Sequence, residues 1–235
     1  MTRCIYQKVS VALKISLLSC SLPLLLSSTA SSQEQNCTQA QIQANIAKFK
    51  DSNKYILEDA VAAVAKCEAE AVKALIETLK DKEPIVRSSA ADALGRIGES
   101  AKSAVPQLIE TLKQDQDKNV RTSAASALAS IGESAKPAVP QLIETLKQDK
   151  DKDVRRYAAY ALWNIGESAK PAVPQLIETL KQDKDKDVRS YAAIALGSIG
   201  ESAKSAVAQL IETLKQDKEA GVRSNAAYAL GTIGE

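Results

Sequence analysis

The sequence predicts an all-α fold, a right-handed α-α solenoid of about five 34-residue helix-pair repeats preceded by a divergent helix pair. Five arginines recur at intervals of 34 residues, and the residues around them recur with them: Arg87, Arg121, Arg155, Arg189 and Arg223. Residues 172–205 differ from residues 138–171 at only five positions. Self-similarity at this period is typical of stacked units, each of which cannot bury its apolar face alone.

The composition limits both the core and the chemistry of the chain. Of its 235 residues 45% are hydrophobic but only 3% are aromatic, so the core must be built from Ala, Leu, Ile and Val. The absence of His excludes mechanisms that need imidazole as a base or a metal ligand. Charges of both signs are interspersed and nearly balanced, without the basic stripe that nucleic acids require. We therefore expect no nucleic-acid partner.

Residues 1–30 have the order of a secretory signal peptide. A basic stretch to Lys14 precedes the mostly apolar residues 15–26, and small residues end at Ala30, where a signal peptidase would cleave. Its loss would leave 28 basic and 29 acidic residues. Two alternatives are an uncleaved anchor, for which about twelve apolar residues are too few, and a lipid on Cys20. The favoured interpretation is export to the periplasm or the extracellular space, with no stable membrane span in the mature chain.

Each repeat contains two helices, A and B, as residues 138–171 illustrate. Helix A opens with a tolerated proline and carries one apolar stripe: Val139, Leu142, Ile143 and Leu146. After a polar turn, Asp153 is the expected N-cap of helix B, which runs from about Val154 to Ile165. Gly166 is expected to end it in a left-handed conformation. The expected inward face of helix B is rich in alanine: Val154, Ala158, Ala161, Leu162 and Ile165.

The recurring pattern is Asp-Val-Arg-x-x-Ala-Ala-x-Ala-Leu-x-x-Ile-Gly followed by Ala-Val-Pro-x-Leu-Ile. It lacks the Trp, Leu-Gly and Tyr signature of the tetratricopeptide repeat, which has the same period. It resembles HEAT-like repeats over residues 71–235, in particular the short bacterial kind also found in the phycobilin lyases. The resemblance implies a structural role for the five recurring arginines, in a ladder with acidic turn residues of neighbouring units. A role in pigment (bilin) attachment stays an alternative, although export argues against it.

Residues 31–70 are expected to form a divergent helix pair that caps the array. Apolar residues at helical spacing mark its two helices: Ile42, Ile46, Phe49, Ile56, Leu57, Val61 and Val64. Once the signal peptide is removed, Cys37 and Cys67 are the two cysteines left, and an even pair in an exported protein favours a disulfide. These residues flank the hairpin, whose two ends lie side by side. Two buried free thiols are the alternative.

No motif indicates a catalytic centre, a metal site or a cofactor. Asp149, Asp151 and Asp153 resemble the start of a calcium loop. However, its sixth and twelfth places hold Val154 and Tyr160 instead of Gly and Glu. A solvated turn that ends in a helix cap explains the acidic residues better. Ser–His and Cys–His pairs are excluded by the composition, and we find no phosphate-binding Gly loop.

The variable positions of helix B predict a binding surface. Four of the five differences between the two near-identical segments lie in helix B, at residues 156, 160, 163 and 164. At about 100° per residue they fall opposite the expected core face. Aromatic residues share this side, and exposed aromatics dominate binding hot spots. The expected partner-binding residues are Tyr157, Tyr160, Trp163, Asn164, Tyr191, Ile194 and Tyr228. Neutral drift on an exposed face is the alternative.

Taken together, the sequence favours an exported, non-catalytic scaffold that binds a protein or peptide on a concave side lined by the B helices. A role in bilin attachment or as a pigment chaperone is one alternative. A structural element of the envelope or matrix is the other.

Overall fold

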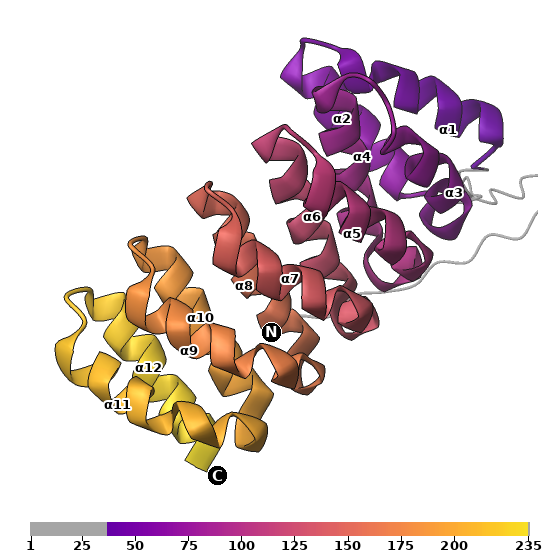
Figure 1. Ribbon diagram of the computed structural model, residues 1–235. Coiled ribbons are helices and arrows are strands. Elements are labelled where there is room, and N and C mark those ends of the chain that lie inside the picture. The colour runs from indigo at the N-terminus through magenta and orange to yellow at the C-terminus, as the bar shows by residue number, and fades with distance from the viewer. Residues whose placement is uncertain (1–36, 235) are drawn as a thin grey trace, which may run out of the picture. The chain divides into compact units, whose positions relative to one another are not determined.

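The computed structural model describes residues 37–234, which fold into helices and turns (Figure 1). The α-helices are α1 (Gln39–Ile46), α2 (Lys54–Ala65), α3 (Glu68–Thr78), α4 (Pro84–Ile97), α5 (Val105–Gln114), α6 (Lys118–Ile131), α7 (Val139–Gln148), α8 (Lys152–Ile165), α9 (Val173–Gln182), α10 (Lys186–Ile199), α11 (Val207–Gln216) and α12 (Ala220–Gly234). The predicted all-α solenoid is confirmed. The expected signal peptide, residues 1–30, lies outside the described residues. None of the described helices is long and apolar enough to cross a membrane.

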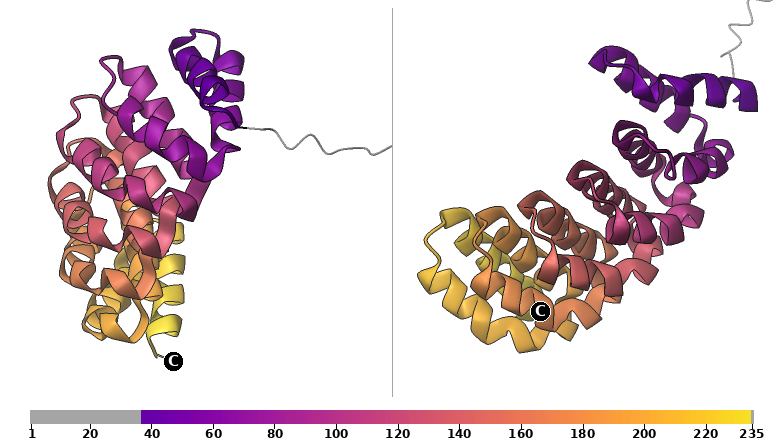
Figure 2. Two further views of the ribbon diagram at one scale, coloured as in Figure 1. Left: turned by 90° about the vertical axis from the view of Figure 1, so that its right-hand side faces the viewer. Right: turned by 45° about the horizontal axis from the view of Figure 1, so that its top comes forward.

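Consecutive helices pair into antiparallel units that stack in chain order (Figures 1 and 2). The divergent pair consists of α1, continued by the 3-10 helix η1 (Ala47–Lys50), and α2. Five regular units follow, in which α3, α5, α7, α9 and α11 are the A helices and α4, α6, α8, α10 and α12 the B helices. A 3-10 helix links each B helix to the next A helix: η2 (Gly98–Ala104), η3 (Gly132–Ala138), η4 (Gly166–Ala172) and η5 (Gly200–Ala206).

The core runs as one continuous cluster between the A and B layers. In helix α7 the stripe is buried at Val139, Leu142 and Leu146, whereas Ile143 is only half-buried. In helix α8 every residue of the expected inward face is buried, and Ala159 is buried too. Small side chains let neighbouring B helices pack along their length, whereas neighbouring A helices touch less. Because the B helices lie closer together, the array curves toward them and their free side is concave.

Helix B begins two residues earlier than the sequence predicts, and its expected cap is wrong. In helix α8 the N-cap is Asp151, whose side chain accepts hydrogen bonds from the backbone N–H groups of Asp153 and Val154. Asp153 is thus a residue of the first turn, where its negative charge interacts favourably with the positive end of the helix dipole. Of the three acidic residues that resemble a calcium loop, Asp151 and Asp153 therefore serve the start of the helix, whereas Asp149 binds an arginine of the preceding unit.

The glycine that ends each complete internal B helix has a positive φ, as expected, but not the left-handed helical conformation. Gly166 has φ 68° and ψ −139°, a combination reserved for glycine because a Cβ atom would clash with the backbone. The chain therefore does not simply turn into helix A. It enters the 3-10 helix η4, which the sequence pattern did not predict and which buries Ala169 and Ala172.

The divergent pair packs its apolar residues onto the first regular unit, with one exception. Ile42, Phe49, Val61 and Val64 are buried, Ile46 and Leu57 are half-buried, and Ile56 is 41% exposed. At the ends of this hairpin the Cα atoms of Cys37 and Cys67 lie 5.4 Å apart, with the two sulfur atoms in contact. This Cα separation is one that a disulfide spans.

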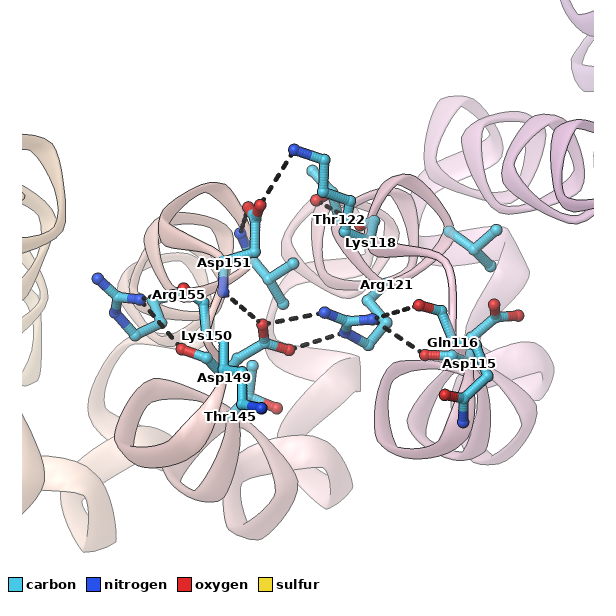
Figure 3. Close-up of polar contacts among 12 residues, drawn as sticks. Asp115, Gln116, Lys118, Arg121, Thr122, Thr145, Asp149, Lys150, Asp151 and Arg155 are labelled. Carbon is cyan, nitrogen blue, oxygen red and sulfur yellow. Dashed lines mark hydrogen bonds and ion pairs between the residues drawn. The ribbon is translucent and has the colours of Figure 1, made fainter.

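An arginine–aspartate ladder joins the regular units on the side of the A–B turns (Figure 3). The Arg121 Nε and Nη2 groups donate to the two carboxylate oxygens of Asp149, at 2.8 and 3.1 Å. The Nη1 group of Arg121 donates to the carbonyl oxygens of Asp115 and Gln116 in its own turn. The same bidentate contact recurs in the pairs Arg87–Asp115, Arg155–Asp183 and Arg189–Asp217.

Two carboxylates of the ladder, those of Asp115 and Asp217, are held in the ionised form despite their burial. Burial raises the pKa of Asp115 and Asp217, but the hydrogen bonds from Arg87, Arg189 and backbone N–H groups outweigh this effect, and both pKa values are lowered. The folded-state pKa of each therefore lies below the ordinary value of 3.8. The stabilisation from these pairs is complete above that value and is lost as the pH falls through the folded-state pKa.

We predict that the ladder contributes measurably to stability, and the chain offers a matched control. Arg189 contacts two turn carbonyls and Asp217, whereas the equivalent Arg223 contacts two turn carbonyls and, within residues 37–234, no carboxylate. Arg189→Ala should lower the free energy of unfolding by roughly 2–4 kcal/mol, because it leaves a buried carboxylate unpaired. Arg223→Ala should cost about 1 kcal/mol. Urea unfolding followed by circular dichroism measures both, and equal losses would contradict a role for the carboxylate.

We also predict that Cys37 and Cys67 form a disulfide when the protein folds under oxidising conditions. A closed loop of 30 residues should stabilise the divergent pair by roughly 3–4 kcal/mol, because the crosslink restricts the unfolded chain. Alkylation of unfolded, unreduced protein followed by mass measurement decides the question. Both cysteines should resist the reagent until a reductant is added; two thiols that react without reductant would show that the bond is absent.

Candidate partner-binding surface

The surface predicted from the variable positions lies on the free side of the B helices. In helix α8, Tyr157 and Tyr160 are half-buried and Trp163 is 37% exposed, whereas the residues on the opposite side of the helix are buried. The helix phase derived from the sequence is therefore right for α8. The tyrosines are nevertheless less exposed than a free helix face would leave them, because they contact one another and the next B helix.

Four aromatic side chains form a cluster, called the aromatic cluster below: Tyr157, Tyr160, Trp163 and Tyr191. Tyr160 is its centre, with ring centroids 6.1 Å from Tyr157, 5.6 Å from Trp163 and 5.5 Å from Tyr191. The rings of Trp163 and Tyr191 lie 6.2 Å apart and close the group across α8 and α10. Edge-to-face pairs at these distances attract each other beyond simple burial. Because the four rings restrict one another's side-chain motion, the cluster is a preformed apolar surface.

Three of the predicted residues lie outside the cluster. Asn164 is exposed and donates a hydrogen bond from its side chain to the Tyr160 carbonyl oxygen at 2.9 Å, within its own helix. Ile194 is half-buried on α10, and Tyr228 is 61% exposed on α12 without an aromatic contact among the described residues. The cluster therefore spans two B helices instead of three.

A hollow of about 330 Å³ lies beside the aromatic cluster, between α6, α8 and α10. Its lining residues are Ser126, Ser130, Arg156, Tyr157, Tyr160 and Tyr191. The two serines occupy the places on α6 that Tyr160 and Asn164 hold on α8, 34 residues later in the chain. The hollow exists because one unit carries small side chains where the next carries large ones.

Three of these lining residues were missing from the predicted surface. Arg156 stands where the following unit has Ser190. It is one of the five differences between residues 138–171 and 172–205, so the sequence did mark this position as variable. Its guanidinium carbon lies 4.9 Å from the centre of the Tyr157 ring, and its Nη2 atom lies 3.1 Å from a carboxylate oxygen of Asp153. Ser126 and Ser130 gave no signal, because serine is unremarkable on an exposed helix face.

Comparison with protein families identifies the repeats. The family described as HEAT repeats matches residues 42–129, 100–163 and 173–235, which together cover most of the chain. The chain belongs to the HEAT-repeat family. A second family, the PBS lyase HEAT-like repeat, matches residues 154–182 of this HEAT-repeat protein, a segment that includes most of the aromatic cluster. The predicted resemblance is confirmed.

Several solved structures share the fold. An engineered protein is 26% identical with a TM-score of 0.61, covering 82% of this chain and 96% of that chain. YibA of Escherichia coli is also 26% identical, with a TM-score of 0.63, covering 85% of this chain and 75% of that chain. Kap95, solved in complex with Nup1, has a TM-score of 0.63 at 16% identity, covering 87% of this chain and 32% of that chain. That last likeness shows the fold alone. A search of curated proteins finds no match.

Proposed function

We propose that this HEAT-repeat protein is an exported, non-catalytic scaffold that binds a protein or peptide on its concave B-helix face. The observation that carries the proposal is the aromatic cluster. A chain with only 3% aromatic residues gathers four of them on one face, outside its core of alanine and leucine. Tyr and Trp are the residues that most often supply binding energy at protein interfaces, because they offer large contact areas at little cost in side-chain entropy.

The fold supports a binding role. Curved repeat arrays offer extended concave surfaces to partners, and Kap95 of the same fold is found in complex with Nup1. The residues that line the hollow are one arginine, two serines and three tyrosines. That set lacks the paired acid and base of a hydrolytic centre, which is why we propose binding without catalysis.

Two other functions lead to different observations. The PBS lyase HEAT-like match over residues 154–182 favours a role in pigment attachment, in which case protein purified from its source would carry the visible absorbance of a bilin. A structural envelope element would instead self-associate and capture no partner, which light scattering and affinity capture would show.

We predict that the aromatic cluster is needed for binding but not for folding. The triple variant Tyr157→Ser, Tyr160→Ser, Trp163→Ala installs the residues that α6 carries at the same places, Ser123, Ser126 and Ala129. Its free energy of unfolding should fall by roughly 1–3 kcal/mol, because partly buried rings and their mutual contacts are lost while the core stays intact. Capture of partners from an extracytoplasmic extract should fall by about tenfold or more.

A control for this experiment lies on the outer face of the same unit. The double variant Glu144→Ala, Lys147→Ala changes two exposed residues of α7 and should leave capture unchanged. If the triple variant unfolds, the aromatic residues belong to the core. If it stays folded and keeps its partners, the binding surface lies elsewhere, and the A helices are the next place to test.

We further propose that export removes residues 1–30, which would place the mature protein in the periplasm or outside the cell. The intact mass of protein exported by its own signal should correspond to a chain that begins at Ser31. A mature chain that starts at Met1, or one that carries a lipid on Cys20, would refute this proposal.

A further inference from the structure

The hollow beside the aromatic cluster differs from the rest of the concave face in its chemistry. Five of its six lining residues are serines and tyrosines, each with a hydroxyl group, and Arg156 is the one charged residue in this lining. A hydroxyl group can donate a hydrogen bond to any acceptor, and a guanidinium group can only donate. The lining therefore offers several donors and one positive charge to whatever occupies the hollow.

Arg156 has capacity left for a ligand. Its side chain is 32% exposed, and its ion pair with Asp153 uses the Nη2 atom. Its Nε atom is buried and has no hydrogen-bond partner among the described residues. Because that nitrogen is buried, a ligand would meet the exposed part of the guanidinium group, whose Nη1 atom has no hydrogen-bond or ion-pair partner among the described residues. Contact with the Tyr157 ring holds the guanidinium group in place.

The positive charge at this position is peculiar to one unit. The other regular units carry serine or threonine at the place of Arg156: Ser88, Thr122, Ser190 and Ser224. None of these residues can supply a charge. The arginine also coincides with the one unit that carries Tyr at residue 160 and Trp at residue 163 together. The cation and the aromatic cluster thus form a single composite surface.

We propose that the hollow is a subsite for an acidic side chain, and that the bound peptide carries an aspartate or glutamate next to an apolar residue. This inference rests on the proposed function, because it names the chemistry of the same partner. The carboxylate would accept from Arg156 and the surrounding hydroxyls, and the adjacent apolar side chain would lie on Tyr160 and Trp163. A volume of about 330 Å³ is at the small end of ligand sites, which fits one side chain.

The test is a selection of random displayed peptides on the purified exported protein. Enriched sequences are synthesised without Trp and with both ends blocked, so that any carboxylate comes from a side chain. They are titrated while the fluorescence of Trp163, the single tryptophan of the chain, is recorded. We expect the binders to carry Asp or Glu beside an apolar residue, and Arg156→Ser to weaken binding by roughly tenfold or more.

Arg156→Ser should fold normally, because it installs the residue that the neighbouring unit carries as Ser190. Replacing the acidic residue of the peptide by its amide should weaken binding to the wild type as much as Arg156→Ser does. The same replacement should have little further effect on the Arg156→Ser variant, since the two groups form one interaction. Independent, additive losses would overturn the pairing.

The remaining outcomes separate this inference from the proposed function. One outcome would refute the subsite and leave the proposed function standing. In it, the bound peptides carry no acidic residue and bind Arg156→Ser as well as the wild type, but lose binding to Tyr160→Ser. If no peptide is enriched, or if binding is indifferent to Tyr160→Ser, both proposals fail.

Discussion

Each helix pair in this chain would expose an apolar stripe unless another pair covered it, and the rest of the structure depends on this need to stack. Leu162 of helix α8, which has a unit on each side, is fully buried, whereas its counterpart Leu230 in the last described helix is only half-buried. The contact between B helices is closest where side chains are smallest. A Cβ atom on Gly197 would lie 3.0 Å from the Ala229 Cα atom, and one on Gly95 would lie 3.2 Å from the Ala127 Cα atom. Close packing on one side bends the array and makes the B-helix face its concave side.

Apolar burial drives stacking but is not directional, so the register between units needs a second, polar contact. The ladder provides it, because a guanidinium group that binds both oxygens of a carboxylate fixes position and angle together. Arg155, for example, holds Asp183 of the next unit while its third nitrogen binds the carbonyls of its own turn. The same arginine therefore shapes one turn and sets the distance to the next. One carboxylate in each turn serves this arrangement: Asp115, Asp149, Asp183 and Asp217.

The period and the apolar pattern were enough to predict the fold, the paired helices and the side of helix B that faces the core. They were not enough to place the helix start, because Asp151 and Asp153 are both good caps and differ only in which backbone N–H groups they reach. The 3-10 helices were missed since a run such as Gly-Glu-Ser-Ala-Lys has no apolar periodicity. Helical spacing correctly placed Ile56 in the second helix of the divergent pair, but spacing alone cannot show that its side chain is 41% exposed there. Arg156 was passed over because the sequence shows which face a residue occupies, but not that small serines on α6 leave room beside it.

Because the units of a periodic array are nearly identical, a ligand could bind equally well at several positions along it. Furrows of about 430 and 400 Å³ lie between successive A helices and are lined by equivalent residues, such as Glu144 and Thr145 in one and Glu178 and Thr179 in the next. A ligand that fits one furrow fits the other, so these furrows cannot define a single position along the array.

A unique site can form only where a unit departs from the repeat. The largest departures in helix B, at residues 156, 160 and 163, fall together on the concave face and build the aromatic cluster with its hollow. The near-identity of the remaining positions is what allows these few changes to occur without disturbing the stack, since Val154, Ala158 and Leu162 continue to pack as their counterparts Val188, Ala192 and Leu196 do in the next unit.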